Sequence, residues 1–193
     1  MTPDLSTTYL GLRLRSPVVA SASPLTGDLA SLRELEREGI GAVVLPSLFE
    51  EQIEHEEVDL YELLEHQTHS FAEALTWFPE LDDYNTGPDS YLEHLRDAKQ
   101  ALAVPVIASL NGVSPGGWLR YARLCQEAGA DALELNVYSI EADPGVSAAD
   151  VEERTLTLVR EVRAAVTIPL AVKVGPFYSA FAHMARRLGE AGA

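Results

Sequence analysis

Five short apolar runs, separated by longer stretches of helical periodicity, constrain the fold of this chain more than any other feature. The runs are rich in β-branched and small apolar residues, as expected for parallel strands covered on both faces. They are 17–22, 41–47, 105–110, 132–137 and 170–175. The amphipathic stretches are 29–38, 91–102, 117–128, 148–166 and 179–190. This alternation predicts βα units with right-handed crossovers and one parallel sheet.

The same junction recurs where a predicted helix gives way to a strand. EREGIGAVVL, QEAGADALEL and the closing GEAGA each place a glycine where a left-handed helix cap is needed. No GxGxxG follows the first strand, which favours a (β/α)₈ TIM barrel over an open doubly wound sheet. Five strands of such a barrel leave an open edge. We therefore expect a barrel truncated after about five βα units, with residues 1–193 as the N-terminal part of one domain. A natural five-stranded open sheet is the alternative.

The segment 48–90 interrupts the alternation. It is longer than the loops that usually join a strand to the next helix. Loops at this end of barrel strands build active sites, so the sequence predicts an inserted lid or wall. From Gly39 through Leu95 there is no Lys or Arg, and the acidic residues there also suit a solvated face.

Charge and composition exclude several classes of partner. The formal net charge of −16 disfavours nucleic acid and anionic membrane surfaces. No apolar run has the length of a membrane span, and the first residues lack the pattern of a signal peptide, so we expect a cytoplasmic protein. The single cysteine, Cys125, is interpreted as a buried structural thiol. We expect no metal site, because His55, His66 and His69 lie among acids without further ligand spacing.

Polar side chains gather where the predicted strands end. Ser21, Ser109, Asn111 and Asn136 stand at or near these ends, where barrels place functional side chains. Their hydroxyl and amide groups suit hydrogen bonding to a flat heterocycle. Lys173 lies inside an apolar strand, where an unpaired ammonium is costly. We therefore expect Lys173 to face an anion or an electron-rich ring at the barrel mouth.

The runs PVVASAS, SLNG, ELNVYS and LAVKV carry a more specific signal. In this order the sequence resembles the dihydroorotate dehydrogenase family through essentially the whole chain. Residues 8–15 match the strand pair that closes the bottom of the family's barrel. The resemblance implies an FMN cofactor and a small dihydropyrimidine substrate, dihydroorotate, oxidised to orotate in pyrimidine biosynthesis. A homodimer is left open.

The resemblance also assigns cofactor contacts. Ala20, Ser21 and Ala22 would pack against the flavin ring with backbone contacts. Asn111 and Asn136 would hydrogen-bond the flavin. Lys173 would approach the N1/O2 side of the ring system, where a positive charge stabilises the reduced form.

Substrate contacts and the catalytic base follow from the same resemblance. Asn136 would also contact the substrate, as would Asn85 in YNTGP. Ser139, three residues after Asn136, occupies the position of the catalytic base. A serine there needs a neighbouring group or a water to take its own proton.

Two positions depart from the family pattern. Pro46 replaces the family's lysine after the second strand, which removes a positive group, and Glu141 replaces an asparagine in the loop after the fourth. Two alternatives therefore stay open: a related dihydropyrimidine-type flavin dehydrogenase, and a non-catalytic truncated remnant. As a fragment, the isolated chain is expected to bind FMN poorly and to be inactive.

Overall fold

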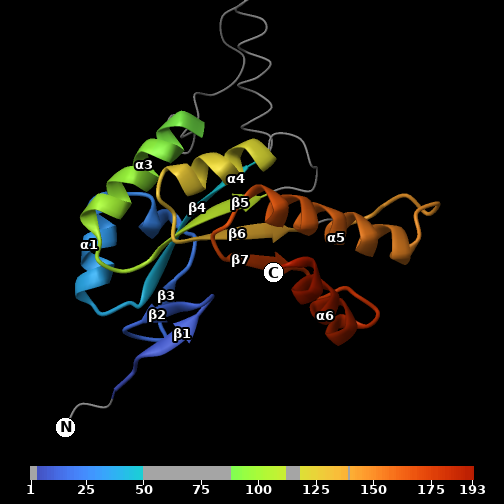
Figure 1. The fold of residues 1–193 in the computed structure, drawn as a ribbon, viewed down its shortest axis with the longest axis horizontal. Helices are drawn as coiled ribbons and strands as arrows, with labels where there is room; N and C mark the ends of the chain where they lie inside the picture. Colours follow the sequence, from blue (N-terminus) through green and yellow to red (C-terminus); the bar gives the residue numbers. More distant parts are fainter. Residues whose placement is uncertain (1–3, 50–87, 112–117, 139) are drawn as a thin grey trace, which may run out of the picture.

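A curled parallel sheet forms the centre of the protein (Figure 1). The computed structural model describes residues 4–49, 88–111, 118–138 and 140–193. The sheet has the order β3-β4-β5-β6-β7, and neighbouring strands are parallel, which confirms the predicted parallel sheet. Its strands are β3 (Val19–Ala20), β4 (Ala42–Phe49), β5 (Val106–Asn111), β6 (Ala132–Val137) and β7 (Leu170–Val174).

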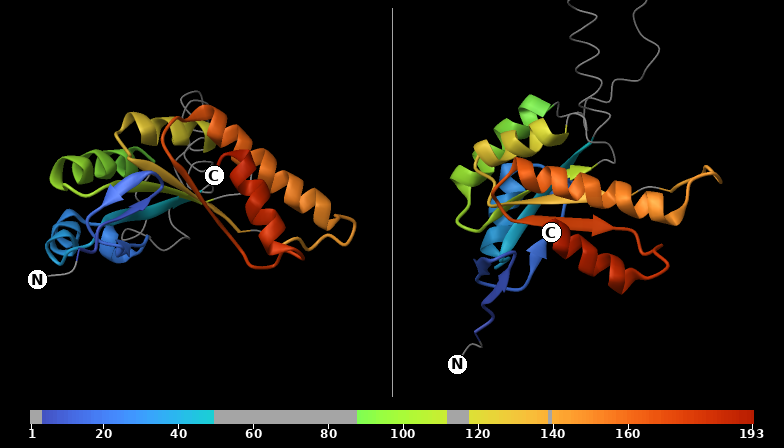
Figure 2. Two further views of the ribbon diagram at one scale, coloured as in Figure 1. Left: turned by 60° about the horizontal axis from the view of Figure 1, so that its bottom comes forward. Right: turned by 45° about the vertical axis from the view of Figure 1, so that its right-hand side comes forward.

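Helices cover one face of this sheet (Figure 2). They are α1 (Leu29–Arg37), α3 (Pro88–Ala101), α4 (Trp118–Glu127), α5 (Ala148–Ala165) and α6 (Phe181–Ala191), with a 3₁₀ turn η1 (Pro24–Thr26) before α1. Their apolar side chains join one core with alternate strand residues such as Val43, Leu133 and Leu135. A doubly wound sheet would have helices on both faces. The described residues therefore form a half-barrel, and the closed eight-stranded form stays a prediction.

The other face, here called the inner face, is closed at the amino ends of the strands by a hairpin. Strands β1 (Thr7–Tyr9) and β2 (Leu12–Leu14) are antiparallel. Leu10 and Gly11 turn between them at φ 53° and 72°, the positive values that a tight hairpin turn requires. Leu14 is 1% exposed and packs against apolar inner-face residues, in line with the strand pair that the family resemblance implied. These are Ala42, Val44, Ile107 and Ala132.

The predicted glycine caps are confirmed. Gly39, Gly129 and Gly192 have φ values of 97°, 100° and 111°, which few other residues tolerate. The interruption predicted at 48–90 is shorter in the structure, because β4 extends through Phe49 and α3 already begins at Pro88. Most of this segment lies outside the described residues.

Polar side chains fasten the loops at the amino ends of the strands. Glu36 Oε1 accepts the backbone N–H groups of Ala103 and Val104 at 2.8 and 3.1 Å. Gln126 Oε1 accepts those of Thr167 and Ile168 at 2.6 and 3.2 Å. Glu36 and Gln126 each stand three residues before a cap glycine, and each fastens the two residues before a strand-opening proline. The two tethers are thus equivalent parts of a repeated unit.

Cys125 is fully buried, as predicted, and this burial raises the pKa of its thiol to about 12. In the described ranges, no helix is long and apolar enough to cross a membrane. His55, His66 and His69 lie outside those ranges.

Candidate functional site

Three polar residues form one row across the carboxyl ends of β5, β6 and β7. Asn111 is the register partner of Asn136, and Asn136 is the register partner of Lys173. Register partners in a parallel sheet point to the same face, and the residues next to them, Leu110 and Leu135, belong to the helix-covered core. The row therefore lies on the inner face. The structure brings these three predicted residues together, while their roles stay predictions.

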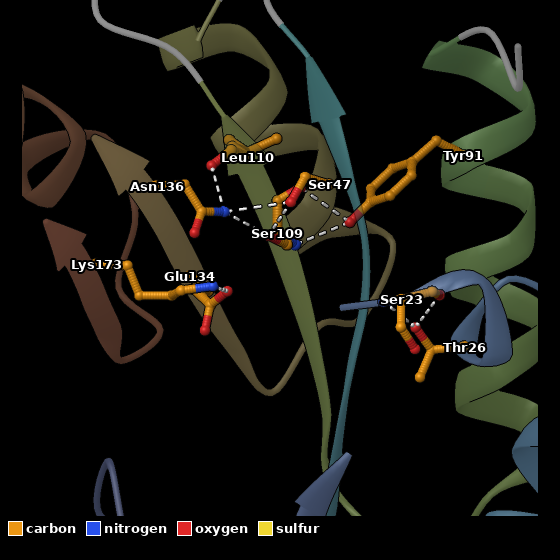
Figure 3. A network of polar contacts seen from close by, with 9 residues as sticks. All are labelled: Ser23, Thr26, Ser47, Tyr91, Ser109, Leu110, Glu134, Asn136 and Lys173. Carbon is orange, nitrogen blue, oxygen red and sulfur yellow. Dashed lines mark hydrogen bonds and ion pairs between the residues drawn. The ribbon is translucent and has the colours of Figure 1, made fainter. Parts of the chain in front are cut away.

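Hydrogen bonds to the neighbouring strands hold the Asn136 side chain (Figure 3). It is 4% exposed, and its Nδ2 donates to Ser109 Oγ at 2.9 Å, Ser47 Oγ at 3.2 Å and the Leu110 carbonyl at 3.3 Å. Because a carbonyl can only accept, the contact with Leu110 fixes the orientation of the amide. No described residue donates to Oδ1 of Asn136.

A β-bulge at Pro46 brings the Ser47 hydroxyl to the inner face of the sheet. The register of β4 against β5 shifts between Val44 and Ser47, and an extra residue in one strand changes which face the following side chains meet. Ser47 consequently reaches the inner face, where its Oγ lies 2.8 Å from Ser109 Oγ. The departure from the family pattern at Pro46 thus falls within the irregular part of the strand.

Tyr91, on α3, hydrogen-bonds to the backbone of Ser109 beside the bulge. Its hydroxyl accepts the Ser109 N–H at 2.8 Å and donates to the Ser109 carbonyl at 3.3 Å. Complete burial raises the pKa of Tyr91 well above its ordinary value, so the phenol remains a donor. Sequence reasoning did not identify this residue, because nothing local connects a helix tyrosine to a strand that begins 15 residues later.

Lys173 has a partner that the sequence reading missed. Its Nζ lies 3.3 Å from Oε1 of Glu134, which is 8% exposed and stands two residues before Asn136 on the same face of β6. The run ALELNV did indicate a pair, because its glutamate, Glu134, also lies inside an apolar strand. An unpaired charge is as costly there as it is for Lys173, so each residue needs a partner of opposite charge.

The residues near β3 that were predicted to contact the flavin lie on both faces of the sheet. Ala20 packs its side chain into the helix-covered core, whereas Ala22 packs against the inner-face cluster and Ser21 is exposed. Only the backbone of Ala20 can therefore serve a ligand on the inner face. Ser139 and Asn85, the proposed base and a proposed substrate contact, lie outside the described residues.

Glu141, the second departure, is engaged with its own loop and α5. Its carboxylate accepts the Asp143 N–H at 3.1 Å and a guanidinium N–H of Arg154 at 2.6 Å. The backbone hydrogen bond first, and then Arg154, lower the pKa of Glu141. Arg154 thus forms an ion pair with the negative charge that this departure introduces.

A cleft of about 670 Å³ opens beside the row, between the loops that follow β6 and β7. Exposed apolar side chains line it, including Ile140 and Phe177 at 91% and 89% exposure. None of Asn111, Asn136 and Lys173 is among its lining residues. The cleft and the polar row are therefore separate features of the same edge.

Curated relatives match nearly the whole chain, although no family model does. A putative dihydroorotate dehydrogenase A (fumarate) of Aeropyrum pernix is 27% identical over 193 residues, 99% of this chain and 60% of the relative. The catalytic subunit of dihydroorotate dehydrogenase B (NAD(+)) of Methanosarcina acetivorans is 33% identical, over 86% of this chain and 51% of the relative. The NAD-dependent dihydropyrimidine dehydrogenase subunit PreA of Escherichia coli is 28% identical, over 91% of this chain and 43% of the relative.

Solved structures support the fold. A 2,3-dimethylmalate lyase has a TM-score of 0.55 at 15% identity, covering 91% of this chain and 54% of that protein. A phosphonopyruvate hydrolase has a TM-score of 0.56 at 16% identity, covering 92% and 56%. Such low identities speak for a shared TIM-barrel-like fold alone. By sequence, the resemblance of this chain to the dihydroorotate dehydrogenase family is confirmed over nearly its whole length, and the chain spans about 60% of the first of these relatives.

Proposed function

We propose that this chain provides the flavin- and substrate-facing edge of an FMN-dependent oxidoreductase that oxidises dihydroorotate to orotate. The observation that carries the proposal is the row of Asn111, Asn136 and Lys173 on the inner face, at the carboxyl ends of three adjacent strands. The names of the curated relatives support the same chemistry.

The polar groups of the row fit a flavin. The nearly buried amide of Asn136, a second amide on Asn111 and the Lys173 ammonium, which lies toward Glu134, offer acceptors and donors along this edge of the sheet. An isoalloxazine edge presents alternating N–H, nitrogen and carbonyl groups that such side chains can bind. FMN, when bound, supplies the hydride acceptor.

The chain's own residues would bind and deprotonate the substrate. Asn136 Oδ1 would accept an N–H of the dihydropyrimidine, and Asn85 would contact the same ring. Ser139 would remove the proton from C5 and pass its own to a neighbour or water. The backbone of residues 20–22 would pack against the flavin.

A neutral dihydropyrimidine is the second candidate substrate. Pro46 carries no charge to meet a substrate carboxylate, and within the described chain Lys173 is the cation of the row, already compensated by Glu134. The similarity to a dihydropyrimidine dehydrogenase subunit agrees with this alternative.

The visible spectrum of the purified full-length protein tests both candidates. We expect bound FMN in a stoichiometric amount, and its anaerobic bleaching by dihydroorotate. Bleaching by a neutral dihydropyrimidine alone would select the second substrate. A protein that takes up no FMN would contradict the proposed function and leave the non-catalytic alternative. Size-exclusion chromatography of the same sample decides the oligomeric state, for which a homodimer was left open.

A further inference from the structure

Glu134 and Lys173 are not level with one another on the inner face. Lys173 is in register with Asn136, whereas Glu134 is in register with Ala171 on one side and Ser109 on the other. At about 3.3 Å per residue, Glu134 lies roughly 7 Å closer to the amino ends of the strands. The ammonium of Lys173 reaches back toward this carboxylate (Figure 3).

The two members of the pair differ in burial. The Glu134 side chain is 11% exposed, and the Lys173 side chain is 46% exposed. Among the described residues, Lys173 is the only hydrogen-bond or ion-pair partner of the Glu134 carboxylate. An unpartnered carboxylate at such a buried position is far more costly than an unpartnered, half-exposed ammonium. Loss of the lysine should therefore harm folding more than loss of the glutamate.

We propose that Glu134 is a positioning residue for the flavin site. It holds the Lys173 ammonium below the Asn136 side chain and compensates its charge, so that a ring bound against Asn111 and Asn136 meets a nearly neutral pair. The part of this inference that concerns the cofactor rests on the proposed function. The part that concerns the pair does not.

A double-mutant cycle in the flavin-free, full-length protein tests the pair. Lys173→Met should reduce the folding equilibrium constant by about tenfold or more, because it leaves a buried charge, and adding Glu134→Gln should restore most of the loss. Urea unfolding measures the stability of all four proteins.

The chain has one other lysine, Lys99, whose partner Asp131 is at 2.5 Å with both side chains 28% exposed. The control variant Lys99→Met should reduce the folding equilibrium constant less than Lys173→Met does. A Lys173→Met variant that is as stable as the control, or is not rescued by Glu134→Gln, would overturn the pairing.

The reduction potential of the FMN-loaded protein tests the effect on the cofactor. Glu134→Gln leaves the charge of Lys173 uncompensated, so the reduced form should be favoured by about tenfold, or about 30 mV for a two-electron couple. Lys173→Met should shift the potential the other way. A glutamate with a merely structural role would leave the potential unchanged, and this result would overturn the positioning role while the proposed function stands. If the protein takes up no FMN, the proposed function fails, and the unfolding cycle alone decides whether Glu134 holds Lys173.

Discussion

The two ends of the strands use polar side chains in opposite ways. At the amino ends, Glu36 and Gln126 bond directly to backbone N–H groups of neighbouring loops. At the carboxyl ends, Asn136 is oriented by other side chains and keeps its Oδ1 free of described partners. The first pattern connects neighbouring loops of the fold, whereas under the proposed function the second presents groups to a ligand. The comparison predicts that substitutions at one end alter stability and those at the other alter binding and chemistry.

The largest effect is expected at the carboxyl end, on chemistry alone. Ser139→Ala should slow flavin reduction by dihydroorotate by at least ~100-fold in the full-length protein, the usual contribution of a general base, while FMN stays bound. Stopped-flow reduction and flavin content measure the two properties. Reduction at the parental rate would remove Ser139 from the mechanism.

A somewhat smaller effect, on stability, is expected at the amino end. A Cβ at Gly41 would lie 2.0 Å from the Ser16 carbonyl oxygen, so Gly41→Ala must displace backbone. We expect a loss of about 1–3 kcal/mol of unfolding free energy. Gly189 provides the matched control, because a Cβ there meets nothing within 4 Å and its position is helical. Gly189→Ala should be neutral or stabilising, by up to about 1 kcal/mol. Equal unfolding curves for the two variants would refute this contrast.

The smallest effect concerns a single tether. Glu36→Ala removes the acceptor of two loop N–H groups and should cost about 1 kcal/mol. Glu36→Gln keeps an acceptor oxygen at the same place and should lose less unfolding free energy than Glu36→Ala. Chemical denaturation distinguishes them, and an alanine variant as stable as the glutamine variant would show that the tether contributes nothing.

The sequence predicted those parts of the molecule that depend on local pattern. The β6 boundaries, the cap glycines at 39 and 129 and the convergence of Asn111, Asn136 and Lys173 all follow from periodicity and strand direction. Other features depend on contacts between distant segments. The pairing of Glu134 with Lys173, and the Tyr91 hydroxyl beside the Pro46 bulge, need a known register between strands and the position of a helix.

The affinity for FMN of one variant from each end tests the central claim most directly. Asn136→Ala removes the ligand-facing amide, and Gln126→Ala removes a tether of similar chemistry at the opposite end of the strands. Fluorescence titration of the full-length protein should show FMN binding weakened about tenfold or more by Asn136→Ala, because a buried hydrogen-bonding partner is lost. Gln126→Ala should lower the melting temperature and leave FMN affinity within about twofold of the parent. If Asn136→Ala holds FMN as tightly as the parent, or if both variants weaken it equally, the polar row does not face the flavin and the account is contradicted.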